Sequence, residues 1–190
     1  MAKPNLTEAD FAHAAARLGC EVAVIKAFCL VESPRGAFEN DGAPTVLFER
    51  HKFHQFTNGR FDKIAPDLSN PTAGGYGLYS AQHGRLDLAA KLDRSAALRA
   101  TSWGQFQLMG FNAGRCGFPD VQSFVNAMYR SAAAQLAAFV SFIESDKELH
   151  QALIAKDWPS AAYLYNGAGY RRNEYDKKMA AAYKGFARVQ

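Results

Sequence analysis

The sequence has no long hydrophobic run and only a few cysteines. No apolar stretch approaches the roughly 20 residues that a membrane-spanning helix needs, which excludes membrane insertion through such a helix. The polar N-terminus lacks the apolar segment of a secretory signal peptide, so we expect synthesis in the cytoplasm. The three cysteines, Cys20, Cys29 and Cys116, are scattered without metal-binding spacing. This pattern favours reduced, buried thiols in a protein made in a reducing compartment.

A large excess of one charge is also missing. The 190 residues carry 22 basic and 18 acidic side chains, which gives a net charge of +4. This balance fits an anionic partner such as a nucleic acid, an acidic cell wall or a membrane surface, and it does not choose among them. Apart from Arg171-Arg172 and Lys177-Lys178, the basic residues do not cluster, which argues against nucleic acid. The length and the 48% hydrophobic content favour one globular domain, residues 1–190, without a separate binding module.

Helical patterns cover most of the chain. Thr7 can cap a first helix that ends at Gly19, and a more apolar helix follows over 21–31 before Pro34 and Gly36 stop it. Residues 34–79 lack helical periodicity, and 45–48 is the best strand candidate in this stretch. We therefore expect a mainly α protein with a small β or irregular lobe, and a cleft between the two lobes. Further helices are predicted near 85–99, 104–110, 121–129, 131–144, 147–155, 158–166 and 173–187, although 93–100 could equally be a turn.

Two glutamates are the main candidates for chemistry. Glu32 closes an apolar helix, where the negative end of the helix dipole and apolar neighbours both raise the pKa of a carboxyl group. Glu49 follows the predicted strand, and its Arg50 and His51 context is expected to keep it ionised. A protonated acid beside an ionised carboxylate can cleave a glycosidic bond. Glu32 could instead be a solvated residue at a helix end, and Glu49 could form an ion pair with Arg50 or Lys52. Asp41 is the alternative candidate for the second carboxylate.

Other chemistries find little support in the sequence. His51 and His54 are three residues apart, but no third convergent zinc ligand is evident, so no metal is predicted. The stretch Gly74-Gly75-Tyr76-Gly77 has the glycines of a phosphate-binding loop without the Lys-Ser/Thr that should follow. No cofactor is implied.

Amide, hydroxyl and aromatic side chains gather in two segments, 101–109 and 162–167. Amides and hydroxyls can hydrogen-bond sugar hydroxyl and acetamido groups, while aromatic faces can cover pyranose rings. Each segment alone could serve packing and capping, and their presence together with Glu32 favours glycan binding. The candidate substrate-binding residues are Ser102, Gln105, Gln107, Tyr165 and Asn166.

The motifs and their order resemble a known family. Val31-Glu32-Ser33, the segment 102–107 and Tyr165-Asn166-Gly167 resemble the lysozyme and lytic-transglycosylase superfamily. The segments 44–51, 69–76 and 100–104, together with 175–183, resemble more closely the N-acetylmuramidase family found in phage endolysins of Gram-negative hosts. The resemblance runs from about residue 7 to residue 186.

This resemblance implies a lysozyme-like fold and cleavage of the β-1,4 bond between N-acetylmuramic acid and N-acetylglucosamine. Glu32 matches the catalytic glutamate of the family, and Glu49 matches its acidic position after Leu-Phe. The implied partner is the peptidoglycan of the periplasm, reached by a monomer after the membrane is permeabilised. The rigid Pro34-Arg35 replaces the glycine-rich turn expected after Glu-Ser. Two alternatives remain: a lytic transglycosylase that needs only one carboxylate, and a non-catalytic glycan-binding module.

Overall fold

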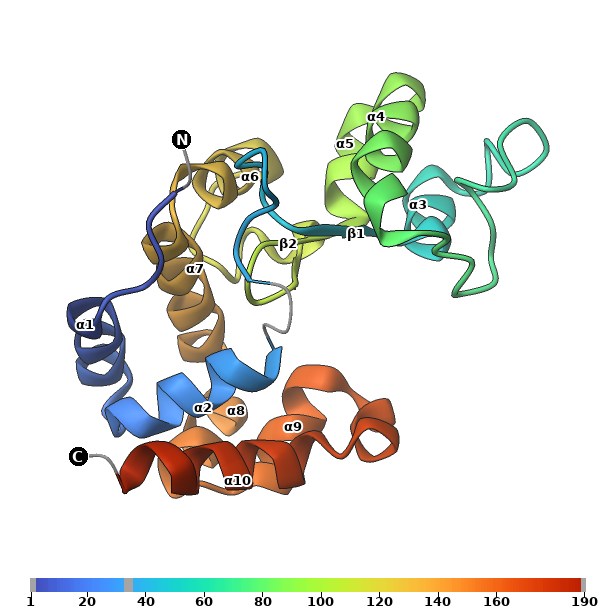
Figure 1. Ribbon diagram of the computed structural model, residues 1–190. Coiled ribbons are helices and arrows are strands. Elements are labelled where there is room, and N and C mark those ends of the chain that lie inside the picture. Colours follow the sequence, from blue (N-terminus) through green and yellow to red (C-terminus); the bar gives the residue numbers. More distant parts are fainter. Residues whose placement is uncertain (1–2, 33–35, 189–190) are drawn as a thin grey trace.

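The computed structural model describes residues 3–32 and 36–188 and shows a helical protein with a small sheet (Figure 1). The expected break after Glu32 and the Pro34-Arg35 loop lie outside the described residues. Within the described part, no helix is both long and apolar enough to cross a membrane. The helices are α1 Glu8–Leu18, α2 Val22–Glu32, α3 Arg50–Thr57, α4 Gln82–Leu92, α5 Arg94–Arg99, α6 Val121–Arg130, α7 Ala132–Glu144, α8 Lys147–Ala155, α9 Trp158–Asn166 and α10 Tyr175–Ala187.

Local capping explains why most helices begin where the sequence predicts. At α1, Thr7 and Asp10 form a capping box and Gly19 ends the helix in a left-handed conformation, as expected. The four helices α6 to α9 each follow a side chain that accepts a hydrogen bond from the backbone NH three residues later. These capping residues are Asp120, Ser131, Asp146 and Asp157.

The larger lobe is built around two apolar helices. In α2, Ile25 and Phe28 are fully buried, and in α7 Phe139 is fully buried. The rings of Phe28 and Phe139 lie 5.0 Å apart, and Phe139 stacks on Phe106 at 4.5 Å. The last helix, α10, packs along α2 (Figure 1). This packing fixes the C-terminal end of α2, and therefore Glu32, against rigid neighbours.

The smaller lobe contains a three-stranded antiparallel sheet in the order β1-β2-β3, together with α3, α4 and α5 (Figure 1). Strand β1 pairs Val46 with Trp103, and β2 pairs Ser102 with Met109. The strands are β1 Val46–Phe48, β2 Thr101–Trp103 and β3 Leu108–Met109. The sheet carries Glu49, at the end of β1, and the turn after β2 toward the space between the lobes.

Three predictions about local structure were wrong. The helix expected at 104–110 is a turn followed by β3, because Gly104 and Gln107 adopt positive φ angles of 68° and 47°. Neither alternative for 85–99, one helix or a turn over 93–100, is observed: Asp93 interrupts the helix, and its extended backbone lets its side chain cap a second helix, α5. The segment 34–79 contains α3, which sequence periodicity did not reveal.

Candidate active site

A cleft of about 850 Å³ separates the two lobes. The larger lobe contributes the end of α2, Asn166 at the end of α9, and Tyr175 at the start of α10. The smaller lobe contributes Glu49, Tyr76 and the turn that joins β2 to β3. The cleft therefore brings together residues that are far apart in the sequence.

Glu32 is a buried carboxyl group in the wall of this cleft. Its side chain ends α2 and the residue is only 9% exposed. The amide Nδ2 of Asn166 donates a hydrogen bond of 3.0 Å to Oε1 of Glu32. Burial raises the pKa of Glu32 to about 7, and the bond from Asn166 opposes this rise because it stabilises the charged form. Near neutral pH, this group can therefore donate a proton to a bound molecule.

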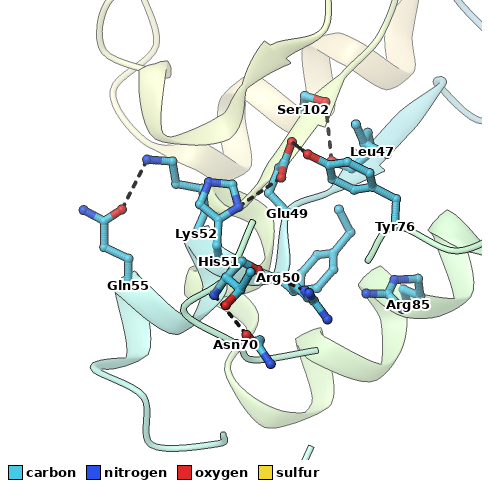
Figure 2. A network of polar contacts seen from close by, with 12 residues as sticks. Leu47, Glu49, Arg50, His51, Lys52, Gln55, Asn70, Tyr76, Arg85 and Ser102 are labelled. Atoms are coloured by element: carbon cyan, nitrogen blue, oxygen red, sulfur yellow. Dashed lines mark hydrogen bonds and ion pairs between the residues drawn. The ribbon is translucent and has the colours of Figure 1, made fainter. Parts of the chain in front are cut away.

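Glu49 lies on the opposite lobe, directly after β1. Its backbone NH donates to the carbonyl of Ala100, and its side chain does not cap α3. The hydroxyl of Tyr76 donates a hydrogen bond of 3.2 Å to Oε1, while Nδ1 of His51 lies 3.1 Å from Oε2 (Figure 2). The contact with His51 lacks the direction of a good hydrogen bond, so it attracts as an ion pair when the imidazole is protonated.

The electrostatics of Glu49 differ from those predicted from sequence. Burial raises the pKa of Glu49 above its ordinary value, and His51, the hydrogen bond from Tyr76 and Lys52 oppose this rise without cancelling it. Arg50, which the sequence also predicted to act on Glu49, is not among the groups that shift this pKa, and its Nε donates to the carbonyl of Thr72. The sequence correctly predicted that His51 lowers the pKa of Glu49, but it did not reveal that burial of the carboxyl group raises this pKa.

Three of the predicted substrate-binding residues shape one side of the cleft. Ser102, Gln105 and Gln107 all line it. The hydroxyl of Ser102 donates to Oε1 of Gln107 at 2.8 Å, and Nε2 of Gln107 donates to the carbonyl of Gly104 at 2.9 Å. These bonds lock the β2–β3 turn, so its amide and hydroxyl groups are held in fixed positions before a ligand arrives.

Two other candidates are placed away from the cleft surface. Tyr165 is not among the described lining residues; its hydroxyl donates to the carbonyl of Phe106 at 2.7 Å and its ring packs on Phe28. It supports the wall of the cleft from behind. Asp41 is exposed and accepts a hydrogen bond from the NH of Ala43, and it is likewise not among the described lining residues.

Sequence reasoning missed several residues that build the site. Tyr76 and Tyr175 line the cleft, and Gln82 supports it from a buried position. Gln135 is 1% exposed in α7, where its Oε1 accepts the NH of Gln105 and its Nε2 donates to the carbonyl of Met128. A glutamine among the alanines and the leucine that begin a mostly apolar helix was a usable signal, because a buried amide needs partners.

The two histidines do not converge on a common point. His51 faces Glu49, whereas Nδ1 of His54 lies 2.8 Å from Asp62, which also accepts a hydrogen bond from Ser69. Within residues 3–32 and 36–188, no group of three or more His, Cys, Asp or Glu side chains could hold a metal ion. The cleft itself is lined by carboxyl, amide and hydroxyl side chains.

Comparison with known proteins agrees with this geometry. A search of curated proteins finds no significant match. The crystal structure of Burkholderia AP3 phage endolysin superposes with a TM-score of 0.91 at 42% sequence identity, over 97% of this chain and 72% of that chain. The family model for N-acetylmuramidase matches residues 21–187. A cleft with a buried glutamate at the end of an apolar helix thus lies within a matched domain, and the chain belongs to the N-acetylmuramidase family.

Proposed function

We propose that the protein hydrolyses the β-1,4 bond between N-acetylmuramic acid and N-acetylglucosamine in peptidoglycan, with Glu32 as the general acid. The observation that carries this proposal is the buried carboxyl of Glu32 in the cleft wall, oriented by Asn166. With a pKa of about 7, a substantial fraction of Glu32 is protonated at neutral pH. Protonation of the glycosidic oxygen makes it a better leaving group as its bond to the anomeric carbon breaks.

Glu49 takes the second role in this proposal. As the bond breaks, positive charge develops on the sugar ring. An ionised Glu49 on the opposite lobe stabilises that charge or removes a proton from the attacking water. Water supplies the new hydroxyl group at the anomeric carbon, so the muramic acid product has a reducing end.

The remaining lining residues bind the glycan. The amide and hydroxyl groups of the β2–β3 turn offer donors and acceptors for sugar hydroxyl and acetamido groups. Asn166 orients Glu32, and the net charge of +4 favours approach to an anionic wall. We infer that a cytoplasmic monomer without a cofactor reaches the periplasmic peptidoglycan once the membrane is permeabilised, and that nucleic acid is not its partner.

The test is digestion of purified peptidoglycan, followed by mass spectrometry of the released fragments. The wild-type protein should release fragments with reducing muramic acid ends. Glu32→Gln should lose about 10²- to 10⁴-fold in rate, the usual contribution of general acid catalysis. Glu148→Gln, the same change at an exposed position of α8, is the matched control and should retain full activity.

Two results would overturn the proposal. Fragments with 1,6-anhydro ends, each lighter by one water, would identify a transglycosylase, in which the muramyl 6-hydroxyl replaces water. A folded Glu32→Gln protein with wild-type activity would remove Glu32 from the mechanism.

A further inference from the structure

Tyr76 is held against Glu49 by the segment 72–78, which we call the glycine loop. Its hydroxyl donates the 3.2 Å hydrogen bond to Oε1 of Glu49, and 36% of the residue is exposed (Figure 2). Tyr76 reaches Glu49 from a separate part of the chain, since Glu49 belongs to the junction of β1 and α3. The contact therefore depends on how firmly the glycine loop is attached to that junction.

Gln82 provides the first attachment. This glutamine is 1% exposed at the start of α4. Its Oε1 accepts the NH of Phe48 in β1 at 3.0 Å, and its Nε2 donates to the carbonyls of Tyr76 at 2.7 Å and Leu78 at 3.2 Å. One buried amide thus joins the backbone next to Glu49 to the backbone of Tyr76. Because each bond is buried or partly buried, breaking it leaves a polar group without water.

Arg50 provides the second attachment, at the other end of the loop. Its Nε donates to the carbonyl of Thr72 at 3.1 Å, and its guanidinium packs against Gly75. A Cβ atom at Gly75 would lie 2.4 Å from Cζ of Arg50, and the φ of Gly75 is +67°. Only glycine allows this close approach in this backbone conformation. Arg50 follows Glu49 directly, and Phe48, which binds Gln82, precedes it. Both attachments therefore hold the glycine loop against the two residues that flank Glu49.

We propose that Tyr76 is a positioning residue that holds the carboxylate of Glu49 in its working orientation and charge state, with Gln82 and Arg50 fixing the loop that presents it. The inference rests on the proposed function, because it gives Glu49 a role in the reaction. Tyr76 acts through Glu49 and takes no proton itself.

The groups that face Glu49 act on its carboxylate in different ways. Lys52 comes from α3 and provides positive charge, as does His51 of the same helix when its imidazole is protonated, whereas Tyr76 comes from the glycine loop and provides a neutral donor. Burial favours the neutral form of Glu49, and the donated bond favours the charged form. Without the hydroxyl, Oε1 loses this bond, and Glu49 protonates at a higher pH.

The experiment compares the wild-type protein with Tyr76→Phe, which removes only the hydroxyl group. NMR titration of the ¹³C-labelled glutamate carboxyl groups gives the pH at the midpoint of Glu49 protonation directly. The Glu49 signal is assigned by its loss in Glu49→Gln. Tyr76→Phe should move that midpoint upward by roughly half to one pH unit, the equivalent of one hydrogen bond. Tyr163→Phe, at a 53% exposed position of α9, is the matched control and should leave the midpoint unchanged.

Kinetics and a second variant complete the test. The base must be ionised, so the acid limb of the kcat profile should move upward with the midpoint in Tyr76→Phe. Gly75→Ala retains the tyrosine but forces its loop away from Arg50, and it should move the midpoint in the same direction. An unchanged Glu49 midpoint in Tyr76→Phe overturns the inference. A shifted midpoint with a fully active Glu49→Gln protein would instead overturn the catalytic role of Glu49, and with it the positioning role that rests on it.

Discussion

The side-chain amide of Asn166 donates a hydrogen bond of 3.0 Å to Oε1 of Glu32 and so joins the end of α9 to the end of α2. The two ends belong to helices that are far apart in the sequence. The bond orients the carboxyl group toward the cleft and moderates the effect of burial on its pKa. Asn166 therefore acts on both the orientation of this carboxyl group and the pH at which it loses its proton.

Replacement of Asn166 should change the pH dependence of activity. A general acid works while it is protonated, so activity falls as pH rises through the pKa of Glu32, about 7. Asn166→Ala removes an interaction that lowers this pKa, so the alkaline limb should move to higher pH. The maximal rate should fall about tenfold, because the carboxyl loses its orientation.

Rates measured across the neutral and alkaline range test this prediction, and Asn126→Ala, at an exposed site, should match the wild type. An alkaline limb that stays in place would contradict the assignment.

The buried Glu32 should also make the protein less stable at alkaline pH. Its pKa is about 7 in the folded protein, whereas an unperturbed glutamate, as in the unfolded chain, has a pKa of 4.5. Below pH 4.5 both states are protonated and burial of the carboxyl costs no ionisation energy. Between these values the unfolded state ionises first, so stability falls as pH rises and becomes constant above about pH 7.

Glu32→Gln should therefore stabilise the protein at alkaline pH while it greatly reduces activity. The expected gain in the free energy of unfolding is up to about 3 kcal/mol at about pH 8 and close to zero at about pH 4. Urea denaturation at the two pH values measures both quantities. An equal change at the two pH values would show that the ionisation of Glu32 is not its cause.

Local signals in the sequence were sufficient for much of the larger lobe. The capping residue Thr7 and the terminator Gly19 indicated α1, and helical periodicity indicated α8, both close to their observed bounds. The family resemblance and the mainly α architecture were confirmed by the family model and by the superposition. The position of Glu32 at the end of an apolar helix also followed from local sequence.

Nonlocal contacts explain what the sequence did not reveal. Strand β2 exists because Trp103 and Ser102 pair with β1 and β3, and this pairing leaves no periodic pattern in so short a segment. Consecutive helix residues point about 100° apart, so Tyr165 turns into the core while Asn166 faces the cleft. The contact of Tyr76 with Glu49 depends on a loop held by Gln82, which no local rule identifies.

The close approach of two segments at Gly110 gives a prediction about stability. This buried glycine follows β3, and a Cβ atom there would lie 2.1 Å from the carbonyl oxygen of Leu98 in α5. Gly110→Ala must push two backbone segments apart and should reduce the free energy of unfolding by about 2–3 kcal/mol. Gly114→Ala is the control, because no atom lies within 4 Å of its added Cβ, and its effect should stay within about 0.5 kcal/mol. Urea denaturation distinguishes them, and equal stabilities would show that this contact is easily relaxed.

The choice between Glu49 and Asp41 as the second carboxylate gives the last prediction. Glu49 lines the cleft beside Tyr76 and His51, whereas Asp41 is exposed and is bound to the NH of Ala43. Glu49→Gln should reduce the rate of peptidoglycan hydrolysis severely, by about 10²-fold or more, though less than Glu32→Gln. Asp41→Asn should retain nearly full activity.

Two measurements decide this choice. Release of reducing ends gives the rate, and thermal unfolding establishes that each variant is folded. A hydrolase that depends on Glu49 should lose activity in Glu49→Gln at every pH, because the amide can neither accept a proton nor stabilise a positive charge as a carboxylate does. If Glu49→Gln is fully active and Asp41→Asn is not, the second role belongs to Asp41, and residues near it must move toward the cleft when the glycan binds. If both variants are fully active, Glu32 works without a second carboxylate, as a transglycosylase would, and the products should then carry 1,6-anhydro ends.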